Sequence, residues 1–280
     1  MATAVICEFN PFHNGHKYLL ESAKNVLKEP VIAIMSGSFT QRGEVAVCDK
    51  FVRAKSALES GADLVLELPV VFSLSGAEGF AKAGVAIASA FDCTNYLAFG
   101  SESGDCELLK KSANAVCDER VQALVRDGMK NGGYYPRELE NAVKTVFGDE
   151  ISSVLCEPNN ILGIEYIKAL NGTGVEPFSV ARTGVAHDSR IAGEGFASAS
   201  HIREMLRNGE NAKKYAPYIP DEITFPENLD RPLLYRLRTM TREDIAKLPD
   251  VGEGLENRIA DAAVRCSTSS EIADLVKTKR

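Results

Sequence analysis

The fold of this chain is decided by a stretch near its N-terminus, Cys7-Glu8-Phe9-Asn10-Pro11-Phe12-His13-Asn14-Gly15-His16. A short apolar run at residues 4–6 precedes this stretch, and a helix-like pattern at residues 17–28 follows it. A strand, a turn and a helix in this order suit phosphate, because a helix N-terminus exposes unpaired N–H groups and the positive end of the helix dipole. We therefore expect His13 and His16 to donate hydrogen bonds to phosphate oxygens at the helix start.

The pattern His-x-Gly-His resembles the signature of the nucleotidyltransferase superfamily, whose members split ATP between its α- and β-phosphates. On its own the pattern also fits a surface turn. Its place between an N-terminal strand and a helix favours the phosphate-binding role. Gly15 has no side chain, so it would let a nucleotide approach the backbone closely.

Length and composition indicate a globular protein with one large or two modest domains. The chain has 280 residues, of which 45% are hydrophobic and 25% charged. No apolar run is long enough to span a bilayer, and the N-terminus lacks a signal-peptide pattern. We expect a cytoplasmic protein with no membrane partner. The seven cysteines form no Cys-x-x-Cys pair, so we expect reduced thiols and no zinc site.

The net charge of −7 argues against a protein that binds nucleic acid non-specifically over its whole surface, but it is compatible with a local basic groove. From Asn228 onward there are ten Lys and Arg against nine Asp and Glu, so this part carries +1 and the first 227 residues carry −8. Its basic residues include a cluster of Arg231, Arg236, Arg238 and Arg242. The cluster fits either an RNA contact or a solvated helical surface.

Strand-like and helix-like segments alternate through most of the chain. The strand-like segments are residues 4–7, 31–35, 63–68, 96–99 and 178–181. The helix-like segments between and around them are residues 15–28, 49–60, 77–89, 107–129, 137–147, 160–170 and 198–208. This alternation predicts an α/β fold, a Rossmann-like parallel sheet with helices on both faces and ligands beyond the carboxyl ends of its strands. We expect a nucleotidyltransferase domain over residues 1–227 and a smaller, mainly helical region over residues 228–280.

A second phosphate-type motif is Ser198-Ala199-Ser200-His201-Ile202-Arg203. Hydroxyl groups, backbone N–H groups and a guanidinium at one helix start can together bind phosphates. Alone, this motif also fits an ordinary helix cap. Paired with His-x-Gly-His it resembles the second nucleotidyltransferase motif, Ser-x-Thr-x-x-Arg, with Ser200 in the place of Thr.

Other segments also carry polar groups that suit a ligand. Gln41 and Arg42 lie in a Gly-rich loop after the second strand and are placed to reach one, although a plain surface loop is the alternative. Asn159 and Asn160 begin a helix. One Asn is enough to cap it, so the side chain of the other is available to contact a ligand. Another helix begins with Asp49, Lys50 and Arg53. These residues fit either a helix cap with solvated charges or contacts to a ligand.

Eight runs, in order across nearly the whole chain, together resemble the tRNA(Met) cytidine acetate ligase family of bacteria. They are Glu8–His16, Met35–Glu44, Gly61–Pro69, Phe99–Asp105, Pro158–Tyr166, Ser198–Arg203, Tyr235–Met240 and Pro249–Ile259. The resemblance implies a carbon–nitrogen ligase that forms acetyl-adenylate and pyrophosphate from ATP and acetate. The acetyl group then passes to the wobble cytidine of elongator tRNA(Met), which gives N4-acetylcytidine. Family members usually continue beyond residue 280 with a further basic helical region, so the expectation of adenylate formation is firmer than that of tRNA acetylation.

The resemblance also implies roles for individual residues. ATP contacts are expected from Ile6, Cys7, Glu8, Phe9, Asn10, Pro11, Phe12, His13, Asn14, Gly15, His16, Lys17, Tyr18, Leu19, Gly100, Asn159 or Asn160, Arg182 and Thr183. Catalysis is expected from His13 and His16 on the reacting phosphates and from Ser198, Ser200 and Arg203 on the pyrophosphate. Arg236, Arg238 and Arg242 are the expected RNA contacts. Mg²⁺ is expected to neutralise the triphosphate, with no dedicated metal site in the protein. No stable protein partner is implied, and a homo-oligomer is compatible with the sequence.

Two other functions share these motifs. One is a nucleotidyltransferase that moves AMP or CMP to a small phosphorylated acceptor; the long helical C-terminal part and the loop at residues 35–44 argue against it. The other is a non-catalytic tRNA-binding protein, against which the intact His13, His16, Ser198 and Arg203 argue.

Overall fold

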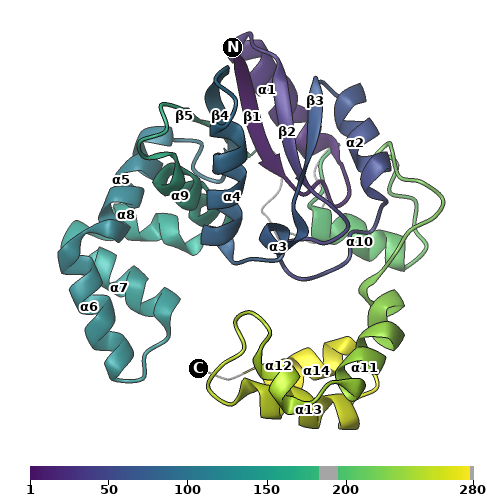
Figure 1. Ribbon diagram of the computed structural model, residues 1–280. Coiled ribbons are helices and arrows are strands. Elements are labelled where there is room, and N and C mark those ends of the chain that lie inside the picture. Colours follow the sequence, from purple (N-terminus) through teal and green to yellow (C-terminus); the bar gives the residue numbers. More distant parts are fainter. Residues whose placement is uncertain (183–194, 278–280) are drawn as a thin grey trace. The chain divides into compact units, whose positions relative to one another are not determined.

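A five-stranded parallel sheet forms the centre of the fold in the computed structural model, which describes residues 1–182 and 195–277 (Figure 1). The strands lie in the order β3-β2-β1-β4-β5, and each pairs in parallel with its neighbours. Their bounds are β1 (Ala2–Cys7), β2 (Val31–Ser36), β3 (Leu64–Leu68), β4 (Thr94–Ser101) and β5 (Glu176–Ala181). The predicted Rossmann-like sheet is confirmed.

Helices cover both faces of this sheet, which explains why β1 and β2 are apolar at successive positions and buried throughout. Along β1, Ala4 and Ile6 point to one hydrophobic cluster, while Val5 and Cys7 point to the other. The first cluster includes residues of α4 (Ala77–Ser89), α5 (Cys106–Cys117) and α9 (Pro158–Leu170). The second includes residues of α1 (Asn14–Leu27) and α2 (Lys50–Glu59).

The segment at residues 107–129, predicted as a single helix, is two helices. The prediction was wrong because Asp118 interrupts the helix: its ψ of 134° is extended, and its side chain accepts a hydrogen bond from the N–H of Arg120 at 2.9 Å. Asp118 therefore ends α5 and caps α6 (Glu119–Lys130). The other helices of this part are α3 (Val70–Ser73), α7 (Tyr135–Phe147), α8 (Asp149–Ser153), a 3₁₀ turn at Val154–Cys156, and α10 (Ala199–Arg207).

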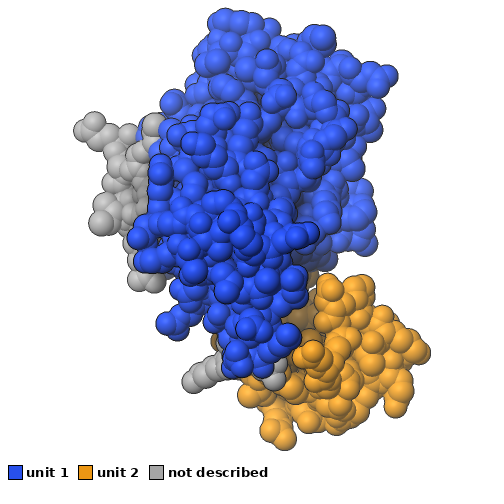
Figure 2. Space-filling view, turned by 90° about the vertical axis from the view of Figure 1, so that its left-hand side faces the viewer, with its two compact units in different colours: residues 1–223 blue, residues 224–280 orange. Residues whose placement is uncertain are grey.

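The chain divides into two compact units, residues 1–223 and residues 224–280 (Figure 2). The boundary lies four residues before the predicted one at residues 227 and 228. The second unit is helical, as expected: a 3₁₀ turn at Pro226–Leu229 leads into α11 (Asp230–Thr239), α12 (Arg242–Ala246), α13 (Leu255–Arg265) and α14 (Ser269–Val276). Its small core is built from Leu234, Ala262, Ala263, Cys266 and Ile272.

Two general features complete the fold. Within residues 1–182 and 195–277, no helix combines the length and the apolar character that a membrane crossing requires. All seven cysteines lie in the described residues and are free thiols.

Arg53, on α2, is a charged side chain in the interior at the carboxyl ends of β1 and β2. It is 1% exposed, and its guanidinium donates only to backbone carbonyls in the described structure. Nη1 donates to the carbonyl of Glu8 at 2.6 Å and to that of Ser36 at 3.1 Å, Nε donates to Cys48 at 3.1 Å, and Nη2 donates to Gly37. Arg53 is thus neither a solvated surface charge nor a cavity residue.

Asp49 and Lys50, which begin the same helix as Arg53, are an ordinary helix cap and a surface charge. The carboxylate of Asp49 accepts a hydrogen bond from the N–H of Phe51 at 2.8 Å and caps α2. Lys50 pairs with Glu67 at 2.6 Å.

We predict that Arg53→Met strongly destabilises the protein. The apolar side chain fills the space but leaves the carbonyls of Glu8, Ser36 and Gly37 without their donor. An unsatisfied buried acceptor costs about 1–3 kcal/mol, so we expect the free energy of unfolding to fall by about 3 kcal/mol or more in a urea titration. Lys55→Ala is the matched control, because the side chain of Lys55 on the same helix is 76% exposed. Equal urea midpoints for the two variants would contradict this role of Arg53.

Candidate active site

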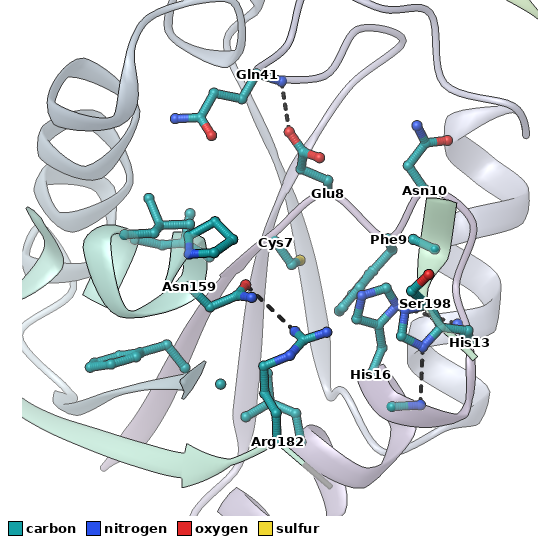
Figure 3. A pocket seen from close by; sticks show the side chains of 18 of the residues that line it. Cys7, Glu8, Phe9, Asn10, His13, His16, Gln41, Asn159, Arg182 and Ser198 are labelled. Atoms are coloured by element: carbon teal, nitrogen blue, oxygen red, sulfur yellow. Dashed lines mark hydrogen bonds between the residues drawn. The ribbon is translucent and has the colours of Figure 1, made fainter. Parts of the chain in front are cut away.

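A cavity of about 290 Å³ lies at the carboxyl end of the sheet (Figure 3). Its walls come from the ends of β1, β4 and β5 and from the starts of α1, α9 and α10. Most of the predicted site residues line it, namely Ile6, Cys7, Glu8, Phe9, Asn10, His13, Gly15, His16, Tyr18, Leu19, Gly100, Asn159, Arg182, Ser198, Ser200 and Arg203. The sheet therefore brings together two motifs that are more than 180 residues apart in the sequence.

Other predicted contacts do not line the cavity. Lys17 points to the surface and pairs with Glu21 at 3.7 Å. The side-chain amide of Asn14 donates to the carbonyls of Gly195 at 2.7 Å and Lys214 at 3.0 Å, so it ties α1 to a later segment. Pro11 and Phe12 are buried, and the ring of Phe12 packs edge-on against that of Phe9. Thr183 lies outside the described residues.

The sequence did not single out the apolar wall of the cavity or two residues of the loop that follows β2. Thr40 and Glu44 line the cavity beside Gln41 and Arg42, which the loop composition had indicated. The apolar wall includes Phe80, Phe99, Ile161, Leu162, Tyr166 and Val180. These residues fit the strand and helix patterns of an ordinary core, so nothing in the sequence separates a cavity wall from core packing.

The two histidines of the first motif cap α1 and stack on each other. Nδ1 of His13 accepts a hydrogen bond from the N–H of Gly15 at 3.0 Å, and Nδ1 of His16 accepts one from the N–H of His13 at 3.3 Å. Their rings are stacked with centroids 3.6 Å apart. Because each Nδ1 is an acceptor, the neutral ring carries its proton on Nε2. Both side chains are therefore hydrogen-bond donors at Nε2.

The electrostatic surroundings keep both imidazoles neutral. Burial, with the positive charges of Arg182 and Arg203, lowers the pKa of His13 to about 3. Burial and the neighbouring His13 and Arg182 lower the pKa of His16 well below its usual value. A lowered pKa means that the imidazole is neutral at every pH above it. The histidines thus offer N–H donors without a positive charge of their own.

Gly15 makes room for this arrangement. A Cβ atom at residue 15 would lie 2.9 Å from Cε1 of His13, closer than such contacts allow. The glycine is therefore required for the ring of His13 to fold back onto the helix start.

The second motif forms the start of α10 and bonds directly to the first. The Ser198 hydroxyl accepts a hydrogen bond from the N–H of His201 at 3.1 Å and caps the helix. Nη2 of Arg203 donates to the Ser200 hydroxyl at 3.3 Å, and Nη1 donates to the carbonyl of Asn10 at 2.9 Å. The guanidinium of Arg203 is thereby fixed beside the turn that carries His13.

A third group of polar residues joins α9 to β5. Glu102 accepts hydrogen bonds from the side-chain amide of Asn159 at 2.5 Å and from the N–H of Asn160 at 2.8 Å. The other side-chain atom of Asn159, Oδ1, lies 3.5 Å from Nη1 of Arg182. Burial lowers the pKa of Arg182, while Glu102 opposes that shift. Asn160 is buried, and its Oδ1 accepts from the N–H of Ser103 at 3.1 Å, so Asn159 alone of the pair lines the cavity.

Some donors of the cavity have no partner in the described structure. Nε of Arg182 and the side-chain nitrogen of Gln41 are buried and make no hydrogen bond there. Both residues line the cavity, so these two donors are available to acceptor atoms of a ligand. The described residues contain no group of three or more His, Cys, Asp or Glu side chains arranged to hold a metal ion.

In the second unit, the three arginines predicted to contact RNA have different surroundings. Arg238 donates to the carbonyls of Ala263 at 2.7 Å and Cys266 at 2.9 Å. Arg242 donates to Asn257 at 2.7 Å and to Asp261 at the same distance. Both side chains thus hold helices of the unit together. Arg236 is exposed, and its side chain makes no hydrogen bond or ion pair within the part of the chain that the structure describes, although its carbonyl accepts from the Thr239 hydroxyl at 3.0 Å.

Comparison with known proteins places the chain in a family. The model of the HIGH nucleotidyl transferase family matches residues 1–280. The tRNA(Met) cytidine acetate ligase of Thermoanaerobacter sp. (strain X514) is 38% identical over 296 residues, which cover 99% of this chain and 73% of that protein. This chain belongs to the tRNA(Met) cytidine acetate ligase family. The enzyme of the same name from Clostridium tetani is 35% identical over 304 residues and is covered to 75%.

Solved structures of this family have the same fold. The crystal structure of Thermotoga maritima TmcAL without ligand matches with a TM-score of 0.90 at 33% identity, over 100% of this chain and 71% of that one. A second crystal structure of that protein, bound with alpha-thio ATP, matches with a TM-score of 0.88 at the same identity and coverage.

Substitutions of the two neighbouring asparagines should have different effects. We expect Asn159→Ala to raise the KM for ATP several-fold and to lower the free energy of unfolding by less than Asn160→Ala does, because its side chain lines the cavity and Glu102 keeps the N–H of Asn160 as a donor. Asn160→Ala should instead lower the free energy of unfolding by about 1–3 kcal/mol, because it removes a buried acceptor of the Ser103 N–H. Steady-state kinetics and thermal unfolding of both variants test this, and a reversed pattern would contradict the assignment.

Proposed function

We propose that this chain activates acetate with ATP and passes the acetyl group to the wobble cytidine of elongator tRNA(Met). The observation that carries the proposal is the Arg203–Asn10 hydrogen bond, which joins two phosphate-type motifs at one cavity. The relatives that share the whole of this chain are tRNA(Met) cytidine acetate ligases, and one of them binds alpha-thio ATP.

In the first step, an oxygen of acetate attacks the α-phosphorus of ATP. The bond between the α-phosphorus and the bridging oxygen breaks, and pyrophosphate leaves. The Nε2–H groups of His13 and His16 stabilise the charge that develops on the phosphate oxygens. Arg203, with Ser198 and Ser200 at the start of α10, holds the pyrophosphate. Positioning and electrostatics account for the catalysis, as in phosphoryl transfer generally.

Mg²⁺ enters this proposal with the nucleotide and not as a resident ion. Mg²⁺ usually keeps several waters and binds through substrate phosphates and one or two carboxylates. The described residues hold no group of three or more His, Cys, Asp or Glu side chains that could bind a metal ion by itself, so substrate phosphates and waters would supply most of the ligands of such a loosely held ion. It would supply further charge neutralisation to the triphosphate.

In the second step, the exocyclic amine of cytidine attacks the acetyl carbonyl, and AMP leaves. The acyl-adenylate is reactive toward water, so we expect it to be consumed in the cavity where it forms. The product is N4-acetylcytidine.

ATP–pyrophosphate exchange tests the first step. We expect exchange that depends on acetate, and we expect His16→Ala to lower its rate by about 10²–10³, the usual cost of losing one such donor. Lys17→Ala is the matched control, since Lys17 lies on the same helix and points to the surface. Wild-type exchange in His16→Ala would remove His16 from the mechanism. Exchange driven by a small phosphorylated acceptor and not by acetate would favour the nucleotide-transfer alternative.

Arg236 provides the cleanest test of RNA contact in the second unit, because Arg238 and Arg242 also support its fold. We expect Arg236→Ala to weaken tRNA binding and to reduce the slope of log K against log salt by about 1, with unchanged thermal stability. Filter binding at several salt concentrations measures both quantities. An unchanged affinity and slope would show that Arg236 makes no phosphate contact.

A further inference from the structure

The acetyl-transfer step releases a proton that the cavity must accept. As the cytidine amine attacks, a C–N bond forms, the bond from the acyl carbon to the phosphate oxygen breaks, and the nitrogen must lose one hydrogen. The lone pair of this amine is conjugated with the pyrimidine ring, so the amine is a poor nucleophile. A base that takes the proton during the attack therefore matters, and this reasoning rests on the function proposed above.

Most polar groups of the cavity wall cannot act as that base. His13 and His16 use Nδ1 to accept backbone N–H groups and carry hydrogen on Nε2. Arg182 and Arg203 have donors only. Burial raises the pKa of the Cys7 thiol well above its usual value, so the thiol is protonated. Within the described residues, the carboxylates that line the cavity are those of Glu8 and Glu44.

Of these two, Glu8 is the one held in place. Its Oε1 accepts a hydrogen bond from the N–H of Gln41 at 2.6 Å, and its carbonyl accepts from Arg53 at 2.6 Å. Its second carboxylate oxygen has no partner in the described structure. Glu44 lies in the loop after β2, and its hydrogen bonds there, from the N–H and hydroxyl of Thr40, are to its main chain.

Apart from the exposed Arg42, which lines the cavity beside Gln41, the charges of the cavity separate into two ends. In Figure 3, Glu8 and Gln41 lie at one end, and His13, His16 and Arg182 lie at the other. A triphosphate is drawn to the end with cations and N–H donors, and a carboxylate repels it. The acidic end therefore suits an uncharged acceptor such as a nucleobase amine.

We propose that the carboxylate of Glu8 accepts the proton of the cytidine amine during acetyl transfer. The lone pair of the nitrogen forms the C–N bond to the acyl carbon, and the electron pair of the broken N–H bond stays on nitrogen. AMP leaves with the electron pair of the C–O bond, and Glu8 becomes a carboxylic acid. Exchange with water then returns the proton to solvent. Glu8 is a catalytic residue of the second step and has no role in the first.

Glu8→Gln tests this without disturbing the site, because the amide oxygen can still accept the Gln41 N–H but cannot take a proton. Two acceptors are compared in single-turnover reactions with ATP and labelled acetate. Hydroxylamine is a strong nucleophile and traps acetyl-adenylate as acetohydroxamate without a base. The anticodon cytidine of tRNA(Met) is the weak nucleophile. Glu44→Gln is the matched control on the same cavity wall, and tRNA affinity is measured for each variant.

We expect Glu8→Gln to form acetohydroxamate at the wild-type rate and to bind tRNA normally, while its rate of cytidine acetylation falls by about 10²–10⁴. Glu8→Asp should recover part of that rate, and Glu44→Gln should keep all of it. Unchanged acetylation in Glu8→Gln would overturn the proposal, and the leaving phosphate would then be the proton acceptor. Loss of acetohydroxamate in Glu8→Gln would also overturn it and assign Glu8 to adenylation. Absence of acetohydroxamate in the wild-type protein would instead contradict the proposed function itself.

Discussion

The carboxyl ends of β1 and β2 are held together by the buried guanidinium of Arg53. Parallel strands end in backbone carbonyls that have left the sheet and lack partners, and an interior carbonyl without a donor is costly. Arg53 supplies donors to Glu8, Ser36 and Gly37 at once, as no neutral side chain could. The same contacts fix where the chain turns after each strand, so the positions of the His-bearing turn and of the Gln41 loop depend on them.

The site combines charged and neutral donors. Arg182 and Arg203 bring positive charge to the cavity, and their proximity contributes to keeping His13 uncharged. The two imidazoles are oriented by hydrogen bonds from backbone N–H groups to their Nδ1 atoms, so the cap of α1 sets the direction of each Nε2–H group. Our proposal thus assigns helix capping and ligand binding to opposite nitrogens of the same rings.

The sequence could predict the features that depend on local pattern. The apolar runs of β1 and β2, the Asp49 cap and the Ser198 cap follow from residue type and spacing. The sequence could not predict the features that depend on packing. The sequence does not indicate that Arg53 is buried, because the same helix also carries Lys50 and Lys55. Asn159 and Asn160 are the same residue type and differ only in which side of α9 they occupy. The roles of Arg238 and Arg242 as internal ties likewise depend on helices that meet only after folding.

We propose that acetate, activated by ATP in this cavity, becomes part of a cytidine in tRNA. The most direct test is to incubate the protein with ATP, labelled acetate and elongator tRNA(Met), digest the RNA, and separate the nucleosides. We expect label in N4-acetylcytidine at the wobble position, dependent on ATP and independent of acetyl-CoA. Acetate-dependent release of pyrophosphate with no label in any nucleoside would contradict it.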